Sequence, residues 1–221
     1  MKNKYDIINL LTKVGAIYEH GHFIGTSGKH FSTYLNKDAL LSKPLYISKI
    51  GKMAAEKFKN KNIEAVVAPA VAAIPFSQWT AYHLSKITQK EVLALFTEKT
   101  AENSQIFKRG YDLAIKNKRV LVVEDITTTG GSVKKVIESV RIAGGKVVAT
   151  CVIINRDPKL VNSKTIGAPF FPLATHKIPS YEAKDCPLCK KGVPVNTELG
   201  HGKNFRDYKE IKKELESLPK K

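Results

Sequence analysis

The sequence has few cysteines and no long apolar run, and each shortage excludes a class of protein. Its three cysteines are a small and odd number, which argues against a disulfide framework and favours a reducing, cytoplasmic setting. No apolar run approaches the ~18 residues that a membrane helix needs, and the N-terminus lacks the apolar stretch and cleavage site of a signal peptide. We therefore expect a cytoplasmic protein without a membrane partner.

Acidic residues are also scarce, because 20 Asp and Glu stand against 37 Lys and Arg, which gives a net charge of +17. Such a charge suits either nucleic acid or a small anionic substrate. The lysines are spread along the whole chain, and no helix-turn-helix, finger or ribonucleoprotein motif accompanies them. We therefore favour an anionic small molecule and do not expect a nucleic-acid partner.

Hydrophobic spacing predicts the elements of an α/β fold. Apolar residues at helical spacing predict helices over 4–18, 44–59, 73–87 and 132–143. Short apolar runs predict strands at 64–70, 92–96, 119–124 and 146–155, and a Ser27-Gly28 turn predicts a hairpin within 21–38. The polar segment 97–112 is expected to be a loop. The alternation predicts a mainly parallel sheet flanked by helices, with ligands at the carboxyl ends of its strands.

After residue 157 this alternation weakens. An extra strand is expected within 165–174, followed by a loop over 176–203 and a solvated helix of mixed charge over 204–218. We therefore expect three parts: an N-terminal helix and hairpin in 1–40, the α/β core in 41–175, and a C-terminal extension in 176–221.

One segment carries most of the chemistry, namely RVLVVEDITTTGGS at residues 119–132. Its strand ends in two adjacent carboxylates, Glu124 and Asp125, which together can accept hydrogen bonds from two vicinal hydroxyls such as those of a ribose. Gly130 and Gly131 let the backbone approach a phosphate, and the following helix directs free N–H groups and its positive dipole end at the same anion. Hydroxyl donors are supplied by Thr127, Thr128, Thr129 and Ser132.

The alternative for this segment is a strand that simply leads into a helix, with Ser132 as its N-cap residue. The adjacent acids favour a binding site, because two like charges side by side are unfavourable unless a ligand uses them. The segment is not a Walker loop, since no Gly-Lys-Ser/Thr follows the glycines.

VLVVEDITTTGGS resembles the phosphoribosyl pyrophosphate signature of type I phosphoribosyltransferases, in which two acids follow four hydrophobic residues and precede a Thr/Gly-rich loop. The resemblance implies the type I fold, Mg²⁺ bound mainly through the substrate with no certain protein ligand, and transfer of ribose 5-phosphate to a nitrogenous base with release of pyrophosphate. It implies that Glu124 and Asp125 contact the ribose hydroxyls. Ile126 would also bind phosphoribosyl pyrophosphate, and its 5-phosphate would be held by Thr127, Thr128, Thr129, Gly130, Gly131 and Ser132.

The N-terminal segment GHFIGTSGKHFSTYLNKDAL resembles the hood of orotate phosphoribosyltransferases, a hairpin that lies over the base. The resemblance implies that Thr26 and Lys29 contact orotate. It also implies that Arg156 pairs with the orotate carboxylate and that Thr128 makes a second contact to the base. The alternatives are a surface hairpin with an exposed lysine, and a surface ion pair between Arg156 and Asp157.

Two further loops resemble parts of the same family. Residues 68–73 resemble the pyrophosphate-binding loop, although a plain strand-to-helix turn explains them almost as well. Residues 98–110 occupy the flexible catalytic loop, whose alternative is a solvated polar loop. There the resemblance makes Glu98, Lys99, Lys108 and Arg109 ligands of phosphoribosyl pyrophosphate, and it assigns catalysis to Lys99 together with Glu124 and Asp125.

Cys186 and Cys189 form a Cys-x-x-Cys motif, which is half of a zinc site. The nearest histidines, His176 and His201, stand at loose spacing, so a turn is the favoured interpretation. A thioredoxin-like redox role lacks the βαβ context that it requires.

The resemblance predicts a homodimeric pentosyltransferase of pyrimidine biosynthesis that uses orotate and phosphoribosyl pyrophosphate. Two alternatives stay open. One is a phosphoribosyltransferase for a purine or another base, and the other is a non-catalytic regulator on the same fold that binds nucleic acid.

Overall fold

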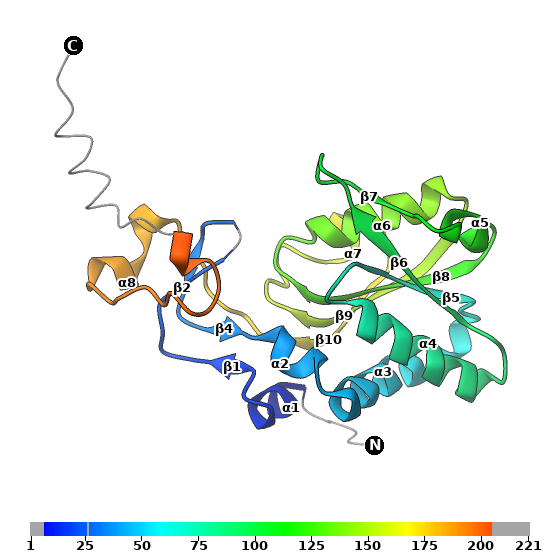
Figure 1. The fold of residues 1–221 in the computed structure, drawn as a ribbon, viewed down its shortest axis with the longest axis horizontal. Helices are drawn as coiled ribbons and strands as arrows, with labels where there is room; N and C mark the ends of the chain where they lie inside the picture. Colours follow the sequence, from blue (N-terminus) through cyan, green and yellow to red (C-terminus); the bar gives the residue numbers. More distant parts are fainter. Residues whose placement is uncertain (1–6, 26, 205–221) are drawn as a thin grey trace, which may run out of the picture. The chain divides into compact units, whose positions relative to one another are not determined.

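The computed structural model describes residues 7–25 and 27–204 of the chain. Its main feature is a six-stranded sheet with the strand order β10-β9-β8-β5-β6-β7 (Figure 1). The neighbouring strands pair in parallel, except that β7 pairs antiparallel with β6 at one edge. The prediction of a mainly parallel sheet is therefore confirmed. The strands are β5 (Ala65–Pro69), β6 (Leu93–Lys99), β7 (Gln105–Ile106), β8 (Arg119–Thr127), β9 (Lys146–Asn155) and β10 (Phe170–Thr175).

Helices cover both faces of this sheet (Figure 1). On one face α6 (Gly131–Ile142) packs Val133, Val136 and Val140 against the strands. Because successive side chains of a strand point to opposite faces, Val120 and Val122 of β8 belong to this cluster and their neighbours face the other layer. The other layer consists of α3 (Pro44–Phe58) and α4 (Ile74–Thr88). Covering both faces explains why residues 120–123 of β8 form an unbroken apolar run.

Helices α3 and α4 lie in close contact at Gly51. A Cβ atom at this position would lie 2.7 Å from the Cβ atom of Trp79 and 2.9 Å from the backbone nitrogen of Thr80. Contacts this short do not occur between real Cβ atoms and backbone, so only glycine fits between the helices as they stand. Both helices carry proline in the first turn, where its missing N–H is not needed.

The observed elements correct several predicted boundaries. The first helix, α1 (Ile7–Lys13), ends well before residue 18, because Gly15 takes a positive φ of 69° and β1 (Ile17–Tyr18) follows. The expected strand within 165–174 begins only at Phe170, because a short helix, α7 (Ser163–Ile166), precedes it. Helix α2 (Lys37–Leu41) was not predicted. Beyond Asn204, the helix expected over 204–218 lies outside the described residues.

The prediction that 97–112 is a loop without regular structure is wrong. The segment contains the end of β6, the whole of β7 and the start of α5 (Tyr111–Ile115). The hydroxyl of Thr97 donates to Oε1 of Gln105 across 2.7 Å, and both side chains are buried. These two polar side chains can be buried in a hairpin because each meets the hydrogen-bonding need of the other. A pattern of hydrophobic residues does not reveal such a pair.

The described chain divides into two compact units. The first holds Lys37–Lys177 together with the N-terminal part up to Ala16, and it contains the six-stranded sheet. The second combines Ile17–Asn36 with the chain from Ile178 onward, so the predicted hood and the C-terminal extension belong together. Its described elements are β1, β2 (Phe23–Ile24), β3 (His30–Phe31), β4 (Tyr34–Leu35), η2 (Ala183–Asp185), α8 (Pro187–Lys190) and η3 (Gly202–Asn204).

We predict that Gly51→Ala destabilises the protein by about 1–3 kcal/mol, because the added methyl group overpacks the α3–α4 contact. For a chain of this length each kcal/mol lowers the melting temperature by about 2–4 °C. Thermal unfolding followed by circular dichroism measures the change. Lys52→Ala, an exposed change on the next residue of the same helix, is the control and should stay within about 0.5 kcal/mol of the parent protein. Equal melting temperatures for both variants would contradict the packing argument.

Candidate active site

The acidic pair lies at the carboxyl end of β8, between β5 and β9 in the sheet. Glu124 is 7% exposed and Asp125 is 3% exposed, so both carboxylates are largely withdrawn from water. The backbone N–H of Asp125 donates to Oε1 of Glu124 at 3.1 Å, and that of Ile126 donates to Oδ1 of Asp125. Backbone donors therefore meet part of the hydrogen-bonding need of two acids that the strand places side by side.

Lys37, at the start of α2, supplies the countercharge, with its Nζ 2.9 Å from Oδ2 of Asp125. Burial alone lowers the pKa of Lys37. The charge of Asp125 and its hydrogen bond outweigh this effect, so the net shift of the pKa is upward and the ammonium form is favoured. The role of Lys37 was not predicted, because nothing in its local sequence connects it to an acid on a distant strand.

The two acids do not share the negative charge equally. Burial raises the pKa of Glu124 well above its usual range, and the neighbouring charge of Asp125 raises it further, whereas Lys37 opposes the shift. The protonated form of Glu124 is therefore favoured relative to an exposed glutamate. A protonated carboxyl is both a donor and an acceptor, so the pair offers a ribose more than two identical acceptors.

The turn after β8 is shaped by Gly130. This residue has a φ of +76°, and a Cβ atom there would lie 3.1 Å from Cγ2 of Ile166, so both conformation and space favour glycine. Gly130 is also the N-cap residue of α6, with Gly131 as the first helical residue. The alternative in which Ser132 caps the helix is therefore wrong. Ser132 and Thr129 are exposed and Thr128 is half-buried, so hydroxyls surround the N-terminus of a 12-residue helix.

Arg156 and Thr128 stand at matching positions of adjacent strands. The register pairs Thr127 of β8 with Asn155 of β9, and the backbone N–H of Arg156 donates to the carbonyl oxygen of Thr127 at 2.9 Å. Both residues thus immediately follow the carboxyl ends of their strands. Burial lowers the pKa of the Arg156 guanidinium. Oδ1 of Asp157 accepts from the backbone N–H groups of Lys159 and Leu160, which places this carboxylate in the following turn.

The hairpin of β6 and β7 gathers three of the four predicted loop residues. Glu98 pairs with Lys108 at 3.1 Å and also contacts the guanidinium of Arg109, which lies over the ring of Phe96. Lys99 is exposed, and no ion pair within the described part of the chain involves it. Ser139 of α6 donates to the backbone oxygen of Gln105, which fastens β7 to the helix that begins at the Gly130 turn.

The segment 68–73 connects β5 to α4 and therefore lies at the same edge of the sheet as the end of β8. The backbone N–H of Ala70 donates to the carbonyl oxygen of Thr97 at 2.8 Å, which ties this connection to β6. Val71 is 80% exposed although its side chain is apolar. The connection thus presents backbone rather than polar side chains, as a phosphate-binding turn without side-chain ligands would.

The predicted hood residues belong to the second compact unit. Thr26 lies outside the described residues, between the two strands of the confirmed hairpin β2–β3. Nζ of Lys29 lies 3.3 Å from Oε1 of Glu182, and both side chains are about half exposed. Such an exposed pair contributes little to stability, so the pair leaves Lys29 available to exchange partners.

We predict that Glu124→Gln raises the melting temperature at pH 8, and that the gain disappears toward about pH 4. The folded-state pKa of Glu124 is raised, so its stabilising contribution is complete at low pH and is lost as the pH rises toward that pKa. Glutamine keeps the acceptor oxygen for Asp125 N–H but never becomes charged. Melting curves at several pH values measure the difference, with Glu138→Gln, an exposed change on α6, as the control. A pH-independent gain would refute this account.

A family model described as the phosphoribosyl transferase domain matches residues 36–166. The chain is 38% identical to the orotate phosphoribosyltransferase of Caldanaerobacter subterraneus over 87% of this chain and 95% of the relative. It is 39% identical to that of Thermotoga maritima over 89% of this chain and 98% of the relative.

Solved structures show the same fold. The orotate phosphoribosyltransferase of Mycobacterium tuberculosis has a TM-score of 0.61 at 21% identity, and the alignment covers 77% of this chain and 96% of the other. An adenine phosphoribosyltransferase from Thermoanaerobacter pseudethanolicus has a TM-score of 0.52 at 17% identity, covering 65% of this chain and 88% of the other. The fold alone therefore does not identify the base that the enzyme uses. The sequence identity to relatives that match over nearly their whole length does identify the family. The chain belongs to the phosphoribosyltransferases and, within them, to the orotate phosphoribosyltransferase family.

Proposed function

We propose that this protein transfers ribose 5-phosphate from phosphoribosyl pyrophosphate to orotate, giving orotidine 5′-monophosphate and pyrophosphate. The observation that carries the proposal is the buried acidic pair Glu124–Asp125 followed by the Gly130 turn and the N-terminus of α6. The pair suits two ribose hydroxyls and the turn suits the 5-phosphate. Family membership then identifies the base as orotate.

The acidic pair is proposed to position the ribose. Asp125 is held by Lys37, so its carboxylate orientation is set before the substrate binds. Hydrogen bonds to the two ring hydroxyls would hold the anomeric carbon in line with the attacking base nitrogen and the departing pyrophosphate. Catalysis of this kind rests on positioning and charge rather than on a covalent nucleophile.

The cations of the β6–β7 hairpin are proposed to neutralise the pyrophosphate. In the described structure Lys108 and Arg109 are paired with Glu98, which holds them in place. A pyrophosphate carries more charge than one carboxylate and would draw these side chains toward it. Lys99, exposed at the end of β6, is proposed as the third cation and as the residue that stabilises charge on the leaving group.

Arg156 and Thr128 are proposed to bind orotate. The planar guanidinium of Arg156 can donate two parallel hydrogen bonds to the carboxylate of orotate. Neutral purine bases have no carboxylate and could not accept this pair of bonds. Their matching positions after β9 and β8, at the end of the strand that carries the acidic pair, support this proposal. Thr26 and Lys29 are proposed to contact the base from the hood.

The residues present fit a Mg²⁺ ion bound mainly through the substrate. Carboxylate oxygens are hard ligands, and Mg²⁺ commonly uses one or two of them together with substrate phosphates and water. Because Asp125 is already paired with Lys37 and both acids are buried, they do not form a complete cage by themselves. The ion would neutralise phosphate charge, with Glu124 and Asp125 as the candidate protein ligands.

A homodimer in the cytoplasm is proposed from the family resemblance. Among the described helices none is both long and apolar enough to cross a bilayer.

Loss of orotate ultraviolet absorbance in the presence of Mg²⁺ and phosphoribosyl pyrophosphate tests the function. We expect orotate to be consumed and adenine and hypoxanthine to remain unchanged in a parallel base panel. Consumption of a purine without orotate would instead support an enzyme for another base. A flat trace together with tight RNA binding would support the non-catalytic regulator.

Arg156→Lys should raise KM for orotate by roughly 10- to 100-fold, since a charge-assisted hydrogen bond contributes about 1.5–3 kcal/mol. The KM for phosphoribosyl pyrophosphate should change far less, because the loss affects only the base carboxylate. Steady-state kinetics with each substrate varied in turn separate the two effects. Lys159→Ala, an exposed change in the following turn, is the matched control. Equal losses for both substrates would remove Arg156 from the orotate site.

A further inference from the structure

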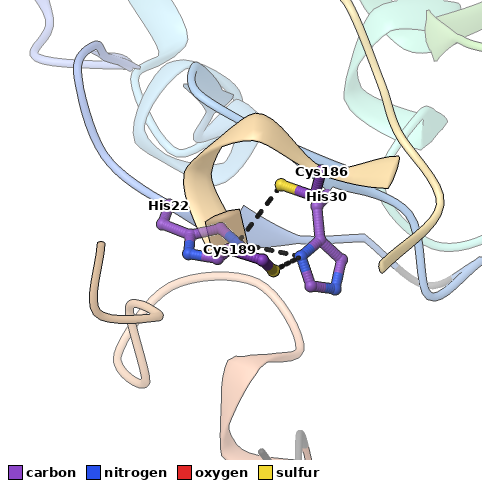
Figure 2. A group of neighbouring side chains, drawn as sticks. All are labelled: His22, His30, Cys186 and Cys189. Atoms are coloured by element: carbon purple, nitrogen blue, oxygen red, sulfur yellow. Dashed lines mark hydrogen bonds between the residues drawn. The ribbon is translucent and has the colours of Figure 1, made fainter. Parts of the chain in front are cut away.

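Four side chains outside the acidic site converge in the second compact unit: His22, His30, Cys186 and Cys189 (Figure 2). His22 directly precedes β2 and His30 begins β3, so each strand of the hood hairpin contributes one histidine. Cys186 is the N-cap residue of α8, and Cys189 lies within that helix. One ligand atom from each residue lies within 4.8 Å of every other. His22, His30 and Cys186 are buried and Cys189 is partly buried.

The distances suit four ligands around one ion. Nε2 of His22 lies 2.8 Å from Nδ1 of His30, 3.8 Å from Sγ of Cys186 and 3.7 Å from Sγ of Cys189. Sγ of Cys189 lies 3.2 Å from Nδ1 of His30. In a tetrahedral zinc site the ligand atoms are about 3.3–3.8 Å apart, as follows from Zn–N bonds of about 2.0 Å and Zn–S bonds of about 2.3 Å. Small shifts of the side chains would therefore accommodate an ion.

Backbone contacts already orient His22 for metal binding. Nδ1 of His22 lies 2.7 Å from the carbonyl oxygen of Val193, which can only accept a hydrogen bond. The proton therefore sits on Nδ1, and in the neutral ring Nε2 presents a lone pair to the cluster. In a metal-bound histidine, the ring nitrogen that does not bind the metal usually donates a hydrogen bond to an acceptor such as a backbone carbonyl. His30 is fixed separately, because its backbone exchanges two hydrogen bonds with Tyr181, at 2.8 and 2.9 Å.

We propose that His22, His30, Cys186 and Cys189 bind one Zn²⁺ ion in a structural site. Two thiolates and two imidazoles in a tetrahedral arrangement are the ligand set that selects zinc among abundant divalent ions. Four protein ligands fill the coordination sphere and leave no position for substrate, so the site stabilises structure and does not catalyse.

The proposed site differs from the interpretation of Cys186 and Cys189 drawn from the sequence. The favoured turn is present as α8, but the cysteines also meet two histidines. The partners are not His176 and His201, the histidines nearest in sequence. The partners are His22 and His30, near the opposite end of the chain, and motif spacing does not connect residues so far apart in the sequence.

The ion would join the hood hairpin to the C-terminal extension. The strands of this unit are only two residues long, so backbone pairing alone holds the hairpin weakly. Small units with little core commonly use a metal ion as a staple. The turn that carries Lys29 lies between the two histidine ligands, so zinc would also restrict the segment proposed to cover the base.

Zinc content of the full-length protein tests the site. The protein is purified under reducing conditions, incubated with equimolar Zn²⁺, passed through a desalting column and analysed by mass spectrometry for metals. We expect about one zinc per chain for the parent protein and for the controls His176→Ala and His201→Ala, since one ion has four ligands. His30→Ala and Cys189→Ser should retain far less. Equal zinc in the site variants and in the controls would overturn the proposal.

A second measurement does not depend on how the variants fold. Cobalt added to the metal-free parent protein should give the visible bands of tetrahedral Co²⁺ and a thiolate-to-cobalt charge-transfer band. Removing zinc with a chelator should make two thiols per chain reactive, whereas Cys151 stays protected because it is fully buried. A parent protein that retains no zinc and gives no cobalt spectrum refutes the site. A Cys186–Cys189 disulfide under these reducing conditions, with no metal, also refutes it.

The zinc site and the proposed activity fail separately. Zinc binding with no orotate consumption would reject the proposed function alone. Orotate consumption by a protein that never binds zinc would reject the site alone.

Discussion

The burial of two adjacent carboxylates at the end of β8 is the constraint on which the rest of the active site depends. Glu124 and Asp125 are buried at the end of a strand that lies between two other strands. A carboxylate buried there is costly unless hydrogen bonds or an opposite charge compensate for the lost water. Lys37 supplies the opposite charge, local backbone N–H groups donate to the acids, and a raised pKa of Glu124 reduces the mutual repulsion. The ion pair and the backbone hydrogen bonds hold the two carboxyl groups in fixed orientations, and their burial costs some stability.

The parallel sheet brings the other parts of the site to the same edge. Strands β8 and β9 end in register, so the backbone N–H of Arg156, just after β9, donates a hydrogen bond to the carbonyl oxygen of Thr127 at the end of β8. The connection after β5 and the hairpin of β6 and β7 leave from the same edge. In the proposed site each strand thus contributes one kind of recognition, for the ribose, the base or the phosphates, although no strand carries the complete site.

The sequence was informative where the chemistry lies in consecutive residues. The acidic pair and the Gly130 turn form one uninterrupted motif, and the apolar run before them identifies a buried strand. Lys37 was not foreseen because its role arises from tertiary contact with Asp125. The β6–β7 hairpin was mistaken for a loop because buried polar residues such as Thr97 and Gln105 look solvent-exposed in a sequence. The two histidines were missed because their cysteine partners lie more than 150 residues away, as the separation of 159 between His30 and Cys189 shows.

The second compact unit combines two segments that lie far apart in the sequence, so its parts are synthesised at different times. The hood hairpin leaves the ribosome early, and Cys189 follows His30 by 159 residues. All strands of the main sheet are made in that interval, so the α/β core is able to fold before the hairpin meets its partners. Until then the hairpin is exposed to cellular metal with only half of a ligand set. Completion of this unit is therefore a late event that depends on translation passing Cys189.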